Sequence, residues 1–254
     1  MFALSATDLD GWLAAYLYPF FRMLALFSSA PLLSHASVPV RVRIGLALLI
    51  TVIVAPTLAA MPAISPYSGA GVLLIVQQLL VGVALGFSLQ VVFAAAELAG
   101  DMIGLQMGLS FASFIDPQRN EQTPIVGSFL GLLMMLLFFT INGHLLLIGA
   151  LADSFASLPV GVDGLHWMEW RRLVGAGAQV FSFGLQIALP VIAALILANL
   201  ALGVLTRSAP QLNLFAVGFP VTLMVGMLVL LLVMPHLMPV LERVLESGFR
   251  VLAR

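Results

Sequence analysis

Long runs of apolar residues, separated by short polar stretches, make up most of this chain. Each run approaches or exceeds the roughly 20 residues that a helix needs to cross the hydrocarbon of a bilayer. The six runs cover residues 11–33, 43–60, 69–96, 124–152, 171–203 and 213–241. Because unpaired backbone groups are costly in lipid, each run is predicted to be helical. The pattern therefore predicts an all-α integral membrane protein with about six helical segments arranged as hairpins.

Several of these predicted helices contain prolines. A proline inside a helix removes one backbone hydrogen bond and kinks the helix. Such prolines lie at positions 19, 56, 190, 220 and 235. The last two runs are predicted to form a long hairpin whose turn, TRSAPQLNLF, covers residues 206–215. The segments are therefore expected to be kinked rather than straight.

The stretch GLSFASFIDPQRNEQTPIVGSF, from Gly108 to Phe129, differs from the apolar runs on both sides of it. Pro117 and Pro124 exclude a continuous helix through this stretch. At membrane depth, non-helical backbone is tolerated only where protein buries it or where it lines a water-filled path. The stretch is therefore either buried in a protein assembly and its pore, or an external loop.

Three bulky apolar side chains lie at the start of this stretch. Met107 lies one helical turn before Phe111, and Phe114 follows. Such side chains are large and deformable. They suit a constriction that excludes ions when shut and yields to a large cargo. An external loop with incidental aromatic residues fits the sequence equally well.

Composition supports the membrane assignment and excludes several kinds of chemistry. Of 254 residues, 62% are hydrophobic and only 8% are charged, whereas a soluble domain has about a quarter charged residues. The chain contains no Cys and no Lys, which excludes thiolate chemistry, a P-loop lysine and a Schiff base. Its four histidines stand apart in the sequence. We therefore expect no metal, no other cofactor and no enzymatic activity.

The arginines do not follow the positive-inside rule throughout the chain. Arg41 and Arg43 place the loop after the first run in the cytoplasm. Alternation of the six runs then leaves Arg171, Arg172 and the arginines near the C-terminus outside, against the rule. Because the rule applies to helices that the membrane itself orients, we expect partner subunits to hold these segments.

A stripe of glycines precedes the polar stretch. Gly100, Gly104 and Gly108 repeat at every fourth position, which on a helix leaves a flat face for close approach of another backbone. The approaching backbone could belong to this chain or to another subunit. The sequence does not favour either of these two contacts.

Five polar residues lie in or beside apolar runs. Arg22 is expected to face a bundle interior or a water-filled cavity, with snorkelling to the interface as the alternative. Glu97 and Asp101 repel each other on one helix face, so they require water, a cationic partner or a helix end. A proton relay is a further possibility for this pair. Asn142 and His144 are expected to be hydrogen-bonded within the bundle.

Four blocks of the chain resemble the FliR family, an integral membrane component of the flagellar type III export gate. The injectisome counterpart of that family is SctT. The blocks are spread over nearly the whole chain and keep the order of the family. They are PLLSHASVPVRVRIGLAL (31–48), AGDMIGLQMGLSFASFIDP (99–117), INGHLLLIGALADSFASLP (141–159) and TRSAPQLNLFAVGFP (206–220).

The resemblance implies a specific assembly. A FliR-like protein assembles with FliP and FliQ into a helical hetero-oligomer, and it works beside FlhB and FlhA. The implied function is gated passage of unfolded flagellar subunits across the inner membrane at the basal body, with part of the complex on the periplasmic side. Residues 1–165 would be a FliP-like part and residues 166–254 a FliQ-like hairpin. Lipid is the other expected partner, and nucleic acid is not expected.

The resemblance also assigns residues to the gate. Residues 107–123 would form a plug inside the pore. Its apolar seal would consist of Met107, Phe111 and Phe114. Its polar part, paired with neighbouring subunits, would consist of Asp116, Arg119 and Glu121. The cytoplasmic tip of the last hairpin, near FlhB, would consist of Arg207, Pro210, Gln211, Leu212 and Asn213.

Three other functions remain as alternatives. The chain could serve an injectisome rather than a flagellum. It could be a secondary transporter for a small solute, since kinked helices with Arg22, Glu97 and Asp101 would suit one. However, the chain is short for a transporter and shows no clear internal repeat. An intramembrane enzyme is the weakest alternative, because no catalytic constellation is visible.

Overall fold

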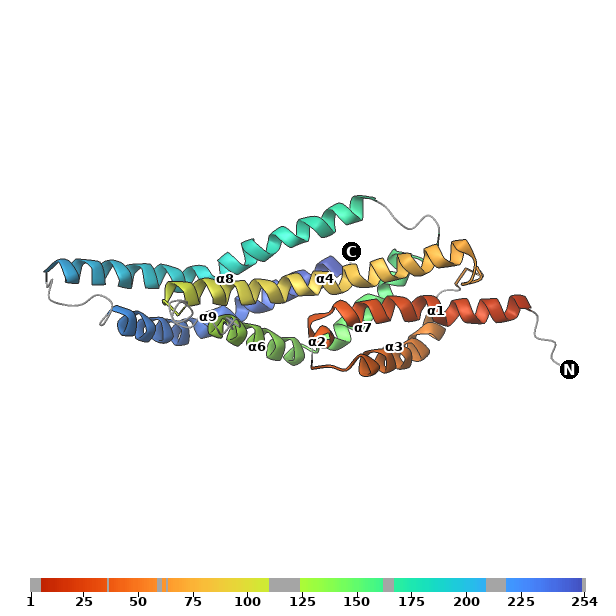
Figure 1. The fold of residues 1–254 in the computed structure, drawn as a ribbon, viewed down its shortest axis with the longest axis horizontal. Coiled ribbons are helices and arrows are strands. Elements are labelled where there is room, and N and C mark those ends of the chain that lie inside the picture. The colour runs from red at the N-terminus through yellow and green to blue at the C-terminus, as the bar shows by residue number, and fades with distance from the viewer. Residues whose placement is uncertain are drawn as a thin grey trace, which may run out of the picture. The chain divides into compact units, whose positions relative to one another are not determined.

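Figure 1 shows a chain built of helices. The computed structural model describes residues 6–35, 37–58, 61–62, 64–109, 124–161, 167–208 and 218–252, and these residues contain no strand. Their helices are α1 (Ala6–Ser29), α2 (Pro31–Ser34), α3 (Val40–Val54), the 3-10 helix η1 (Ala55–Thr57), α4 (Gly69–Gln106), α6 (Ile125–Thr140), α7 (Gly143–Ser157), α8 (Trp167–Ser208) and α9 (Phe219–Leu252). The expectation of an all-α membrane protein is confirmed.

The apolar runs form fewer membrane spans than their number suggested. Within the described ranges, four helical segments are long and apolar enough to cross a membrane: Val40–Thr57, Gly69–Gln106, Gly175–Ser208 and Phe219–Glu246. The bent pair α6–α7 makes a fifth span if its two helices are counted together. Of the six apolar runs, all predicted to be helical, four or five therefore also pass as candidate spans by length and composition.

The first run is helical, but it is not one of these spans. It forms α1 and the short α2. Tyr16, Pro19 and Arg22 lower the hydropathy of α1, so this helix is less apolar than the four segments above. The first run is therefore helical, as predicted, although α1 does not pass as a candidate span by length and composition.

Prolines occupy two kinds of position. Pro19, Pro190 and Pro235 lie inside α1, α8 and α9. Pro56 lies in η1, where α3 has already ended. Pro220 is the second residue of α9, and there its missing N–H would have had no helical partner. Two of the five prolines thus mark helix ends rather than helix interiors.

The run at 124–152 divides into α6 and α7 at Asn142. This residue has φ 54° and ψ 36°, the left-handed conformation that Asn tolerates better than most residues. The next residue, Gly143, approaches Phe138 so closely that a Cβ would lie 2.6 Å from a ring carbon. Asn142 therefore ends α6 through its left-handed backbone, and Gly143 leaves the space that Phe138 occupies at the start of α7.

α4 is a continuous helix of 38 residues. At a rise of 1.5 Å per residue it is about 57 Å long, nearly twice the roughly 30 Å of bilayer hydrocarbon. Apolar side chains surround it without a polar face, as expected of a helix enclosed by protein or lipid. Glu97 and Asp101, which the sequence placed on one helix face, both lie within this helix.

The chain forms two compact units. The first unit consists of residues 1–91, 138–177 and 246–254, and the second unit of residues 92–137 and 178–245. Helices α4, α6, α8 and α9 each contribute residues to both units. The expected division near residue 165 concerned likeness to two other subunits, and it stays a prediction.

Each unit has its own apolar core. In the first unit, α1 packs against α3, and α4 and α7 contribute further buried residues. Its most deeply buried side chains include Tyr18, Met23, Leu26, Leu89 and Leu151. The core of the second unit includes Ile103, Met107, Leu130, Met134 and Ile187.

Candidate functional site: the stem of the polar insert

We define residues 110–123 as the insert, and the end of α4 with the start of α6 as its stem. Most of the residues expected to form the plug and the hairpin tip lie outside the described residues. These are Phe111, Phe114, Asp116, Arg119 and Glu121 in the insert, and Pro210, Gln211, Leu212 and Asn213 at the tip. The stem is described in full, and it determines where the insert begins and ends.

Gly108 ends α4 and sets the direction in which the chain enters the insert. Its φ of 82° lies in the left-handed region. Its N–H donates to Leu105 O at 3.0 Å, and Leu109 N–H donates to Gly104 O at 3.0 Å. This pair of bonds is the Schellman arrangement, in which glycine after the last helical turn satisfies carbonyls that would otherwise lack partners. The root of the insert is therefore hydrogen-bonded to α4.

The insert returns at Pro124, directly before α6 begins. The Pro124 carbonyl accepts a hydrogen bond from Ser128 N–H at 2.8 Å, so it closes the first turn of the helix. Proline suits this place because the first N–H groups of a helix have no partner inside it. Each end of the insert is thus set by a residue typical of a helix end.

Helices α4 and α6 touch backbone to backbone beside the insert. A side chain on Gly100 would collide with the backbone of Val126 and Gly127. A Cβ on Gly104 would meet only ordinary contacts, the nearest being Val126 Cγ2 at 3.8 Å. This close crossing holds together the two helices that carry the insert.

The glycine stripe therefore does not act as one flat face within this chain. Gly100 packs against α6, Gly104 has room for a methyl group, and Gly108 supplies a left-handed helix end. The first of these three roles fits the expected contact within the chain. A contact of the stripe with another subunit stays a prediction.

Glu97 and Asp101 face α6, where two glycines make room for them. A Cβ on Gly127 would collide with Asp101 Oδ1, and a Cβ on Gly131 would lie 3.2 Å from Glu97 Oε1. Asp101 Oδ1 is buried and has no hydrogen-bond partner among the described residues, and Glu97 is exposed. Because α4 continues to Gln106, Glu97 and Asp101 lie inside the helix rather than at its end.

The end of α4 also contacts α9. The Met107 side chain is fully buried. A Cβ on Gly226 would lie 2.5 Å from Met107 Cγ and 2.8 Å from its Cε, so this side chain occupies the space that glycine leaves. Thr222 Oγ1 lies 3.4 Å from Met107 O and 3.0 Å from Phe219 O of its own helix, so its single proton is shared between these two acceptors. Neither Thr222 nor Gly226 was predicted, although a single glycine inside an apolar helix generally has a packing reason.

Arg22 lies in the first unit and faces its interior. Its guanidinium is fully buried and donates to Gln78 Oε1 at 2.8 Å, to Ser154 O at 2.9 Å and to Leu158 O at 2.9 Å. It also lies 3.9 Å from the centre of the Phe155 ring. Arg22 does not snorkel to a surface. Two adjacent glutamines, at 77 and 78, lie inside an apolar run, and this unusual pair was the available sequence signal for a partner of Arg22.

The two polar residues near the α6–α7 break are not joined by the expected hydrogen bonds. The side chain of Asn142 makes no capping bond to α7. His144 Nδ1 is buried and has no hydrogen-bond partner in the described part of the chain. Its ring lies 5.8 Å from that of Phe139, at a tilt. Asn142 thus contributes its backbone conformation, and His144 contributes apolar contact.

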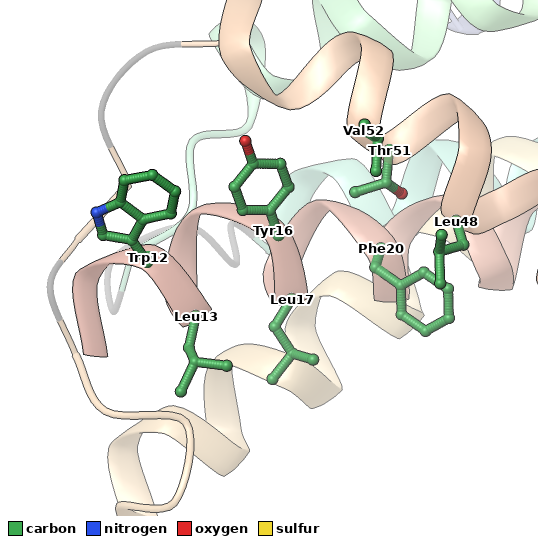
Figure 2. Close-up of a pocket in the computed structure, with 8 residues that line it drawn as sticks. All are labelled: Trp12, Leu13, Tyr16, Leu17, Phe20, Leu48, Thr51 and Val52. Carbon is green, nitrogen blue, oxygen red and sulfur yellow. The ribbon is translucent and has the colours of Figure 1, made fainter. Parts of the chain in front are cut away.

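The first unit contains one hollow of about 500 Å³, shown in Figure 2. Five side chains from α1 and three from α3 line it, and nearly all the lining is apolar: Trp12, Leu13, Tyr16, Leu17, Phe20, Leu48, Thr51 and Val52. The Thr51 hydroxyl already donates to Ala47 O at 2.6 Å. No group of three or more metal-ligating side chains occurs among the described residues. The hollow thus offers apolar surface rather than catalytic groups.

These features define a class: a helical membrane protein in which a polar insert interrupts the apolar helices and is held at both ends. The chain matches the family described as "Bacterial export proteins, family 1" over residues 13–248, and it belongs to that family. It is 47% identical to the flagellar biosynthetic protein FliR of Escherichia coli strain K12, over 95% of this chain and 92% of that protein. The resemblance found in the four sequence blocks is confirmed.

Other relatives carry the same name. Identity to FliR of Pectobacterium carotovorum is 45%, over 100% of this chain and 97% of that protein. Identity to FliR of Bacillus subtilis is 34%, over 84% of this chain and 83% of that protein. The similarity therefore extends across almost the whole chain, including both sides of the insert.

Proposed function

We propose that this chain is a membrane subunit of the bacterial flagellar protein export apparatus, and that its insert plugs the export channel. Near full-length similarity to proteins named as flagellar biosynthetic FliR supports the first part. The second part rests on one observation about the stem. A polar insert leaves α4 at a hydrogen-bonded glycine and returns beside a backbone-to-backbone crossing of α4 and α6.

In this proposal the chain works by gated passage and not by catalysis. It assembles with FliP and FliQ in the inner membrane, beside FlhB and FlhA, and unfolded flagellar subunits pass through the assembly. Phe111 and Phe114 form the apolar seal, and the hairpin tip that follows Arg207 lies near the cytoplasmic mouth. Asp116 and the other charged residues of the insert pair with neighbouring subunits.

A stem held at both ends suits a plug. A segment that must block a pore without being carried through it needs fixed ends and a body that can move. Gly108 and the Gly100–Gly127 crossing supply the fixed ends. Large apolar side chains exclude ions from a narrow path by dewetting, and they deform when a chain enters. The insert contains two such large apolar side chains, Phe111 and Phe114.

The transporter alternative has lost part of its support. Arg22 was one of three charged residues available to bind a solute. All three of its nitrogens now have acceptors within the fold, and none of these acceptors is a carboxylate. An arginine with its donors satisfied in this way is a structural residue. The flagellar names of the relatives likewise favour the flagellum over the injectisome.

Shortening the insert tests the proposal. Removing residues 110–122 should leave the complex assembled, because the stem contacts lie outside the deleted part, and should make the membrane leak. We would reconstitute the assembled complex in liposomes and measure the release of a small dye and the collapse of an ion gradient. Gly149→Ala is the matched control, since nothing lies within 4 Å of a Cβ there. An unchanged leak from a verified assembly would exclude the plug.

A further inference from the structure

Met107 follows α4 in the second unit and contacts α9 three residues before the insert begins. It follows the last residue of α4 and precedes the helix-ending Gly108. The main chain on either side is hydrogen-bonded back to α4, through Met107 N–H to Ile103 O at 2.9 Å and through Gly108 N–H to Leu105 O. A displacement of Met107 would therefore displace the root of the insert.

α9 presents a notch that receives Met107. Thr222 and Gly226 are four residues apart, so they lie on one face of the helix, one turn from each other. Gly226 leaves the space that the Met107 side chain fills. The Thr222 hydroxyl lies 3.4 Å from the Met107 carbonyl, although the Phe219 carbonyl of α9 is nearer, at 3.0 Å. Met107 is thus held mainly by its side chain, with a weak contact to its backbone.

The position of this contact sets it apart from general packing. The Gly100–Gly127 crossing fixes α4 to α6 seven residues earlier, about 10 Å along the helix. Met107 provides a second attachment, to a different helix, three residues before the insert begins. Full burial also means that Met107 presents no surface to a cargo. These observations suit an anchor better than a part of the apolar seal.

We infer that Met107, seated on Thr222 and Gly226, is the anchor through which α9 positions the plug. The inference rests on the proposed function and adds positioning residues to it. Met107 and Gly226 hold the root of the insert in place, so that its aromatic residues meet the pore at the right depth. A movement of α9 along its axis would pass directly to the insert through this contact.

The first test crowds the notch. Gly226→Ala places a methyl group against Met107 and should raise the leak of the assembled complex toward that of the shortened insert, while the yield of complex stays unchanged. Gly203→Ala on α8 is the control, because nothing lies within 4 Å of a Cβ there. Wild-type leak from Gly226→Ala would overturn the anchor.

A double variant with complementary changes in side-chain size then tests whether Met107 and Gly226 act together. Met107→Val removes side-chain volume about equal to what Gly226→Ala adds, so the double variant should leak less than Gly226→Ala alone. Residues in contact show such non-additive effects, whereas independent positions add. Leak that is simply additive in the double variant would overturn the inference even if both single variants leak.

A disulfide cross-link tests the contact between positions 107 and 226 even if the complex with Gly226→Ala does not assemble. The chain has no cysteine, so Met107→Cys with Gly226→Cys gives the only disulfide that this chain can form within itself. We expect it to form under mild oxidation in the assembled complex, to keep the leak at the wild-type level and to reduce export. Failure to form in a verified complex would overturn the anchor.

These results separate the anchor from the plug. If the complex with the shortened insert leaks but the complex with Gly226→Ala does not, the plug is supported and the anchor is wrong. If the shortened insert stays tight, the proposed function is wrong, and the cross-link still reports whether Met107 and Gly226 are neighbours.

Discussion

At the scale of single residues, backbone conformation explains Gly108, whose spacing from other glycines suggested a role in helix packing. Gly108 completes an evenly spaced stripe with Gly100 and Gly104, and small residues at that spacing generally allow close helix contact. Its φ of 82° gives it a different role, because a Cβ is disfavoured in that region whatever space is free. Spacing alone could not separate the two explanations.

Two substitutions at Gly108 distinguish these explanations. Gly108→Ala should destabilise the complex by about 1 kcal/mol, because alanine resists the left-handed conformation. Gly108→Asn should cost less, because Asn adopts this conformation more readily although it is larger. Thermal unfolding of the purified complex in detergent would give the order. If Asn is worse than Ala, crowding at a contact face is the correct explanation instead.

At the scale of elements, Arg22 joins three helices of the first unit. It belongs to α1, Gln78 belongs to α4, and Ser154 belongs to the last turn of α7. Two of its acceptors, Ser154 O and Leu158 O, are carbonyls at the C-terminal end of α7, where the helix carries partial negative charge. Ser154 O also accepts from Leu158 N–H at 2.9 Å. A buried cation is thus satisfied by a helix end rather than by a carboxylate.

Substitutions of Arg22 should weaken this junction in a defined order. Arg22→Met leaves acceptors unsatisfied in the core, at about 1–3 kcal/mol for each. Arg22→Lys keeps the charge but not the planar fork, so its loss should be intermediate. Arg41→Met is the control, because Arg41 is exposed. The midpoint of thermal unfolding of the purified complex is the measurement, and equal midpoints for Arg22→Met and Arg41→Met would contradict the junction.

The sequence predicted elements better than it predicted their contacts. Apolar runs are long and lipid excludes alternatives to helix, so all six runs were recognised as helical. The break at Asn142 was missed because hydropathy continues through it, although the Asn-Gly pair signals a turn. The seat of Met107 on Gly226 could not have been predicted, because it joins residues 119 positions apart whose types are ordinary in a membrane helix.

At the scale of the whole molecule, the apolar surface exceeds what a bilayer can cover. In an 18-residue apolar stretch of each candidate span, the share of residues buried within this chain is only 11% for Val40–Thr57, 17% for Phe219–Glu246 and 22% for Gly175–Ser208. The α8 span, Gly175–Ser208, has 34 residues and is about 51 Å long. At an ordinary tilt of about 20° it rises well beyond the roughly 30 Å of hydrocarbon. We therefore expect other protein subunits to cover the remaining apolar length.

This excess of apolar surface predicts that the chain is stable only in a hetero-oligomer. Expressed with its genomic neighbours and extracted in mild detergent, it should co-purify with several small membrane proteins in one complex, and native mass spectrometry would give the intact mass. Expressed without them it should aggregate or be degraded, because large contiguous apolar faces outside the bilayer have no partner. A stable monomer or homodimer, obtained while the neighbours are demonstrably expressed, would mean that lipid or detergent alone satisfies these faces. The exposed apolar surface would then no longer support an export assembly. The carboxylates Glu97 and Asp101 would become the first residues to test as the binding site of a transporter.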